Sequence, residues 1–184
     1  IKHNSVSDSF KHFCNSSIKF MFDIIIIYIF IYIMSKKVWG PITWITFHSL
    51  CELIKEEYFE EEKQNIINLI KSMCVNLPCP YCSQHAAIHL KKMNFNKIKN
   101  KNDLKMCIWT FHNVVNKHTK HSEQPVSILD KYKRANLNLV LDRLFDVYKR
   151  SYVSNKYLMY KFHSSKVLND LKTYMISNKH KFKM

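Results

Sequence analysis

The chain has 184 residues, enough for one domain with its own hydrophobic core and an appended segment. Its 47% hydrophobic content excludes wholesale disorder, and six cysteines are too few for a disulfide scaffold at this length. The net charge of +15 would suit a polyanion, but a composition rich in Lys, Asn and Ile also accounts for it.

Glycine is nearly absent, since Gly40 is the only one in the chain. Tight turns and left-handed backbone positions are therefore few, which favours helices joined by polar loops. A glycine-rich phosphate loop cannot be written with one glycine, so any nucleotide must be held by side chains. We predict an all-α fold.

Residues 1–33 differ in composition from the rest of the chain. The apolar run Ile24–Met34 has 11 residues, fewer than the roughly 20 that a spanning helix needs, which leaves membrane association open. Because "MSKKVWGP" is typical of a natural N-terminus, we expect Met34 to be the start of the mature protein. Residues 1–33 are then a leader or a hydrophobic N-terminal segment.

Helical periodicity predicts four helices in the middle of the chain. The first has Pro41 in its first turn. The others begin near Glu60, at Cys79–Pro80 and near Asp103, and the last ends near Lys120. Shorter helical patterns follow at residues 126–134, 137–152 and 167–176. We therefore predict a domain over residues 34–124 and a basic helical C-terminal extension of unknown role over residues 125–184.

The segment "NLPCPYCSQHAAIHL" holds the clearest chemical motif, the pair Cys79 and Cys82. With Pro80 as first helical residue, Cys79 caps the helix and Cys82 lies in its first turn, about 5–6 Å away. A disulfide can bridge that distance, and the positive helix end stabilises a thiolate. The pair is predicted to be redox-active and catalytic.

Zinc is the alternative for this segment, because Cys79, Cys82, His85 and His89 are all common zinc ligands. All four lie within 11 consecutive residues, however, and one stretch of helix cannot place them tetrahedrally around a metal. The corresponding alternative function is a zinc-stabilised, basic helical module that binds nucleic acid. We favour the redox pair and predict no metal site.

A candidate cofactor wall combines aromatic, hydrogen-bonding and cationic side chains on the fourth predicted helix. These residues are Trp109, His112, Asn113, Asn116, Lys117 and Lys120, and the first helix adds Trp44 and His48. Each has an ordinary structural explanation by itself, in the core or on the surface. Their joint occurrence beside the cysteine pair favours a site for an electron acceptor with a diphosphate.

Three motifs follow one another along the chain. They comprise Trp39, Gly40, Trp44 and His48, then Pro78, Cys79 and Cys82, and then His112, Asn113, Asn116 and Lys120. In this order and spacing, over about residues 38–121, the chain resembles the FAD-linked sulfhydryl oxidases of the Erv/ALR type. It is especially similar to the short oxidases of large cytoplasmic DNA viruses.

The resemblance implies a four-helix bundle with a short fifth helix that binds FAD. Cys82 would face the isoalloxazine ring, and Cys79 would exchange with the substrate. The cofactor would contact Trp39, Gly40, Trp44, His48, Trp109, His112, Asn113, Asn116, Lys117 and Lys120. The net reaction would convert two thiols and dioxygen into a disulfide and hydrogen peroxide.

The other cysteines determine the expected partners. No cysteine follows Cys107, so electrons would come from a separate thiol protein, either the substrate or a redox shuttle. Cys51, Cys74 and Cys107 are predicted to be buried free thiols, with a pairing of two of them across the bundle as the alternative. A homodimer is left open, nucleic acid is not an expected partner, and the expected location is a host cytoplasm or a virion. A flavin-free interaction protein is a further alternative.

Overall fold

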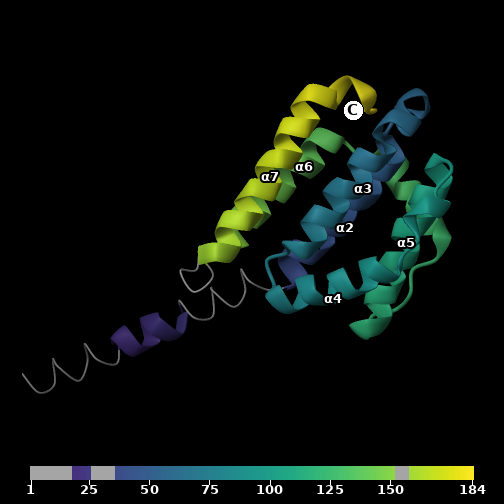
Figure 1. Cartoon of the computed structure of the whole chain (residues 1–184). Coiled ribbons are helices and arrows are strands. Elements are labelled where there is room, and N and C mark those ends of the chain that lie inside the picture. Colours follow the sequence, from purple (N-terminus) through teal and green to yellow (C-terminus); the bar gives the residue numbers. More distant parts are fainter. Residues whose placement is uncertain (1–17, 26–35, 152–157) are drawn as a thin grey trace, which may run out of the picture.

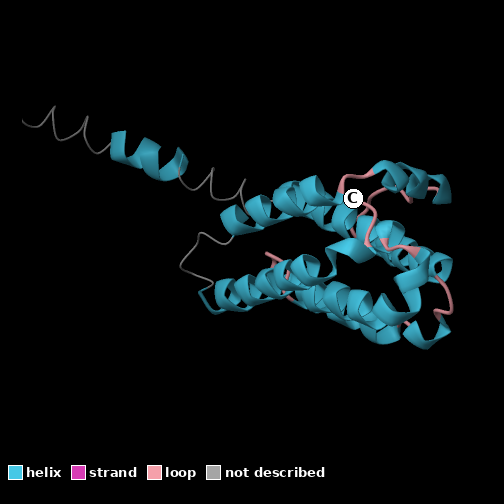
Figure 2. Cartoon of the chain, turned by 90° about the horizontal axis from the view of Figure 1, so that it is seen from above, coloured by secondary structure: helices cyan, strands magenta, loops and turns pink. Residues whose placement is uncertain are grey.

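The computed structural model describes residues 18–25, 36–151 and 158–184. Figure 2 shows helices and loops throughout this part of the chain, which confirms the predicted all-α fold. Residues 18–25 are helical, whereas most of the apolar run Ile24–Met34 lies outside the described residues. Within the described ranges, no helix has the length and apolar character needed to cross a membrane.

The helices follow the predicted order, including the short fifth helix as η3. Their bounds are α2 Lys36–Leu53, η1 Glu56–Tyr58, α3 Phe59–Val75, α4 Pro80–Lys92, η2 Phe95–Lys97, α5 Lys101–His118, η3 Val126–Arg134, α6 Leu137–Ser151, α7 Leu158–Asn178 and η5 Lys179–Lys181.

Helix ends reflect local sequence signals. The side chain of Asn100 accepts from the Asp103 N–H and Asp103 in turn accepts from the Asn100 N–H, a capping box that begins α5.

The prediction that Pro41 lies in the first turn of its helix was wrong, because α2 begins at Lys36 and Pro41 lies inside it. Trp39 and Ile42 are both buried, so packing on either side of the proline outweighs one lost backbone hydrogen bond.

The helices form three layers (Figure 1). Helices α2 and α3 are central, α4 and α5 cover one side, and α6 and α7 cover the other. Side chains from all three layers join one hydrophobic core, which includes the buried Phe47, Leu104 and Leu144. The C-terminal helices are therefore part of the same packed body as the bundle.

Polar contacts reinforce the packing of the C-terminal helices. The hydroxyls of Thr43 in α2 and Tyr148 in α6 are 2.7 Å apart. Near the end of the chain, the Lys181 amine is paired with Glu61 and with the buried Glu62, which also accepts from the Tyr174 hydroxyl at 2.6 Å. The division into domains at residue 124 stays a prediction.

Candidate active site

The cysteine pair lies where the sequence placed it. Cys79 and Cys82 form a disulfide with their Cα atoms 5.2 Å apart. Cys79 is the N-cap of α4, Pro80 is its first residue, and the Cys79 sulfur accepts from the Cys82 N–H at 3.2 Å. This sulfur therefore lies at the positive end of a helix, where a thiolate is stabilised.

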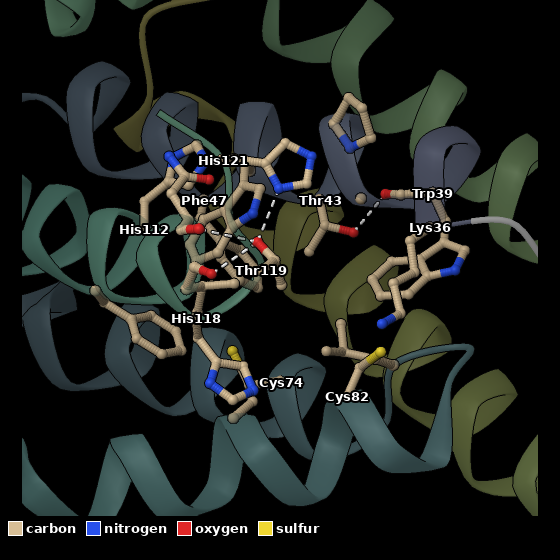
Figure 3. A pocket seen from close by; sticks show the side chains of 18 of the residues that line it. Lys36, Trp39, Thr43, Phe47, Cys74, Cys82, His112, His118, Thr119 and His121 are labelled. Atoms are coloured by element: carbon tan, nitrogen blue, oxygen red, sulfur yellow. Dashed lines mark hydrogen bonds between the residues drawn. The ribbon is translucent and has the colours of Figure 1, made fainter. Parts of the chain in front are cut away.

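A cavity of about 1280 Å³ lies beside the disulfide, between α2, α4, α5 and η3. It is larger than the roughly 300–1,000 Å³ of most small-molecule sites. Cys82 lines it and Cys79 does not. In Figure 3, Cys82 extends from α4 on one side of the cavity, and Trp39 and Thr43 come from α2 on the other.

The cavity wall combines aromatic rings, cations and imidazoles. The aromatic residues are Trp39, Trp44, Phe47, Tyr81, Phe111 and Tyr132; the lysines are Lys36, Lys37 and Lys131; the histidines are His85, His89, His112, His118 and His121. Such a wall suits a flat, conjugated ligand with negatively charged groups.

The structure brings together only part of the predicted cofactor set. Trp39, Gly40, Trp44, His112 and Asn116 line the cavity. His48 lies behind the wall, and Lys117 and Lys120 are exposed. The roles of these residues toward a cofactor stay predictions.

Trp109 and Asn113 hold a loop. The Trp109 indole N–H and the Asn113 amide both donate to the Gln124 carbonyl, at 3.0 and 2.9 Å, and the Gln124 N–H donates to Asn113 at 2.9 Å. Gln124 and Ser122 line the cavity, so these two predicted residues fix one of its borders. Their contact with a cofactor stays a prediction.

A stack of rings connects three elements at the back of the cavity. Trp44 and His112 are parallel within 8°, with ring centroids 4.0 Å apart. His48 lies 3.1 Å from His112, Nε2 to Nδ1, and its ring stacks on Tyr132 of η3 at 4.8 Å. Sequence reasoning missed Tyr132 and its neighbour Lys131, because no motif linked η3 to the bundle.

Both imidazoles in this stack are neutral at pH 7. Burial, followed by His112 and Lys131, lowers the pKa of His48 to about 3. Burial and Lys131 lower the pKa of His112 to about 4. Burial also raises the pKa of Tyr132 to about 12, so its hydroxyl stays protonated. The wall thus presents uncharged rings beside the lysine amines.

The free energy of unfolding should therefore fall as the pH drops from about 6.5 towards 4. In that range the unfolded chain protonates both histidines while the folded chain keeps them neutral, which corresponds to about 3 kcal/mol for each histidine. Because solvent screens this partly buried pair, we expect acid to favour unfolding by on the order of 3 kcal/mol in total. Urea unfolding of the cofactor-free protein at several pH values measures this. His112→Gln, which removes one of the two groups, should reduce the pH dependence by about half. If the His112→Gln variant keeps the same pH dependence of unfolding, the assignment of neutral, buried histidines is wrong.

The other three cysteines of the described residues are not part of the disulfide. Cys51 and Cys74 are buried and Cys107 is partly buried, all three are free, and burial raises the pKa of each. Cys74 lines the cavity.

Across the described residues, no group of three or more His, Cys, Asp or Glu is arranged to hold a metal, and the sulfurs of Cys79 and Cys82 are bonded to each other. This arrangement gives the zinc alternative no support.

A helical bundle with a disulfide at a helix N-terminus, beside a large aromatic cavity, defines a class of thiol–disulfide redox protein with room for a bound cofactor. The sequence model of the Erv1 / Alr family matches residues 41–135, about half of the chain. The chain belongs to this family, which confirms the resemblance noted in the sequence.

One curated relative is the protein named "Putative FAD-linked sulfhydryl oxidase 096R" of Invertebrate iridescent virus 3. It is 28% identical over 84 residues, which cover 45% of this chain and 57% of the relative. The chain thus spans little more than half the length of that protein. No solved structure matches the chain.

Proposed function

We propose that this protein is an FAD-dependent thiol oxidase that forms disulfides in partner proteins. The observation that carries the proposal is the placement of the disulfide, with Cys82 on the wall of the aromatic cavity and Cys79 outside it. Family membership and the name of the viral relative agree with it.

The residues of the cavity fit FAD. The Trp39 indole N–H is buried at the cavity without a hydrogen-bond partner in the described chain, so a ligand acceptor would satisfy it. Trp44 and Tyr132 would supply ring surfaces for the cofactor. Lys36 and Lys131 would supply charge to its diphosphate. Gly40 needs no special role, since a Cβ there would meet nothing within 4 Å.

The chain's own chemistry is thiol–disulfide exchange. A partner thiolate attacks the Cys79 sulfur, the Cys79–Cys82 bond breaks, and Cys82 leaves as a thiolate. The partner's second thiol then attacks the mixed disulfide, which releases the oxidised partner and leaves both cysteines reduced with two protons and two electrons. When bound, FAD supplies a two-electron acceptor that returns the pair to its disulfide and reduces dioxygen to hydrogen peroxide.

The proposed partners follow from this chemistry. The electron donor is a thiol-bearing protein, either the substrate or a separate shuttle, and dioxygen is the final acceptor. A homodimer is proposed as the assembly, and a host cytoplasm or a virion as the place of action. The viral relative supports the last point.

The visible spectrum of the purified protein tests the proposal. We expect a yellow protein with a flavin band, and consumption of dioxygen when a small dithiol is added. Trp44→Ala should weaken FAD binding by about tenfold, since a stacked aromatic contact contributes roughly 0.5–1.5 kcal/mol. Titration of the cofactor-free protein with FAD measures the loss, and Phe95→Ala, which removes a partly buried aromatic ring outside the cavity wall, is the matched control. A colourless protein that takes up no FAD would refute the function.

A further inference from the structure

Acidic and basic side chains are separated along this chain. Six carboxylates lie between residues 52 and 62, and none lies between residues 63 and 102, a stretch that contains seven lysines. Helix α3, with 17 residues and a length of roughly 25 Å, has three of these carboxylates in its first turn and leads toward the disulfide at its other end. The positive charge near the disulfide therefore reflects placement as well as composition.

Helix α4 presents one exposed face that runs from its first turn, where the disulfide lies, to its last turn. Its spacing of three and four residues places these side chains in one stripe, here named the α4 stripe. It consists of Tyr81, Gln84, Ile88, Lys91 and Lys92. The opposite face, with Ser83, Ala86 and Leu90, is buried.

The α4 stripe is apolar near the disulfide and cationic at its far end. Tyr81 and Ile88 are 59% and 52% exposed and, seven residues apart, lie on the same face of the helix. Lys91 and Lys92 are exposed and have no ion pair among the described residues. From the neighbouring helix α2, the Lys36 amine lies 5.8 Å from the Tyr81 ring centroid.

We infer that the α4 stripe is the docking surface for the thiol-bearing partner, and that this partner is an acidic polypeptide with an apolar side chain beside its cysteines. The inference rests on the proposed function. Cys79 caps α4 and does not line the cavity, so an attacking thiol reaches it from outside the cavity, at the end of the helix where the α4 stripe begins with Tyr81. A bound segment that continues along α4 then meets Ile88 and, after it, the two lysines.

The geometry also gives the register of the partner. Lys91 and Lys92 follow Cys79 by 12 and 13 residues, about 18 Å along a helix. An extended chain covers that distance in roughly five or six residues. The partner's carboxylates should therefore lie five or six residues from its reactive cysteine. Apolar contacts between the disulfide and the cations favour a polypeptide over a nucleic acid.

Binding of redox-inert peptides tests the surface without turnover. The probe is a labelled peptide with Ser-x-x-Ser in place of its cysteines, an adjacent leucine and an Asp/Glu block five to six residues away. By fluorescence anisotropy with the full chain, we expect it to bind about tenfold more tightly than the same peptide with a neutral block, and salt should remove most of the difference. Equal binding of the acidic and neutral peptides would overturn the inference.

Charge-reversal variants distinguish the effect of the α4 stripe on peptide binding from the effect of the protein's net charge. Lys91→Glu/Lys92→Glu should weaken binding of the acidic probe by about tenfold or more. Lys149→Glu/Lys172→Glu, on exposed positions of α6 and α7, makes the same change in net charge and should leave binding within about twofold. Ile88→Ser should weaken the acidic and neutral probes alike. Equal losses of probe binding in the two double variants would overturn the inference. A DNA duplex serves as a second probe, and a loss of DNA binding with unchanged binding of the acidic peptide would overturn the inference as well.

Turnover distinguishes this inference from the proposed function. With the cysteine-containing acidic peptide, Lys91→Glu/Lys92→Glu should raise KM about tenfold and leave kcat and the oxidation of a small dithiol unchanged. If the unmodified protein oxidises neither the peptide nor the small dithiol, the proposed oxidase fails. If it oxidises the small dithiol but shows no preference for the acidic peptide, only the docking surface fails.

Discussion

Replacing Cys82 by serine should abolish dioxygen consumption with a small dithiol, by at least about a thousandfold, while FAD stays bound. Serine cannot form the disulfide that takes up the substrate's electrons, and the aromatic and cationic residues of the cavity remain in place. An oxygen electrode measures the turnover, and the visible spectrum measures the cofactor. Cys107→Ser, which changes a free thiol outside the cavity wall, is the matched control. Turnover that survives in the Cys82 variant would defeat the mechanism.

Cys79→Ser should stop turnover as well. The single active-site thiol that remains should, however, differ between the two variants in its accessibility to reagents. In the Cys82→Ser variant the remaining Cys79 lies outside the cavity, whereas in the Cys79→Ser variant the remaining Cys82 faces the cavity that FAD would fill. With FAD bound, an alkylating reagent should therefore modify Cys79 several-fold faster than Cys82. Faster alkylation of Cys82 would reverse the assignment of the two roles.

Replacing Lys181 by methionine should destabilise the protein far more than the loss of an exposed ion pair does. The Lys181 amine pairs with Glu61 at 2.6 Å and with Glu62, whose side chain is almost entirely buried. Without the lysine, the Glu62 carboxylate stays buried and has lost its cation, which is strongly destabilising. We expect the fall in the urea midpoint to be several times that of Lys166→Met, which breaks the exposed Lys166–Asp170 pair worth about 1 kcal/mol or less.

The effect of Lys181→Met should also depend on pH. Burial raises the pKa of Glu62, but hydrogen bonds from Lys181, Tyr174 and Asn65 outweigh it and hold this pKa below its usual 4.5. The depressed pKa contributes stability above about pH 4.5, and this contribution is lost as the pH falls through the folded-state pKa. The difference between the variant and the unmodified protein should therefore shrink in acid. Equal losses for Lys181→Met and Lys166→Met at pH 7 would show that this contact does not hold the C-terminal helices.

The sequence by itself determined the order of the helices and the immediate surroundings of the disulfide. Pro80 after Cys79 starts α4, and Asn100 with Asp103 starts α5, because helix ends depend on contacts within a few residues. The short distance between Cys79 and Cys82 follows from helix geometry alone. These signals are local, so they are complete in the sequence.

Only the tertiary structure decided which residues share the cavity. Tyr132 and Lys131 reach it because η3 packs on α2, whereas Trp109 turns to the Gln124 carbonyl. The pairing of Lys181 with Glu62 joins positions that are 119 residues apart. Periodicity shows which face of a helix is buried but not which remote element covers it, because that choice depends on how all the apolar faces pack at once.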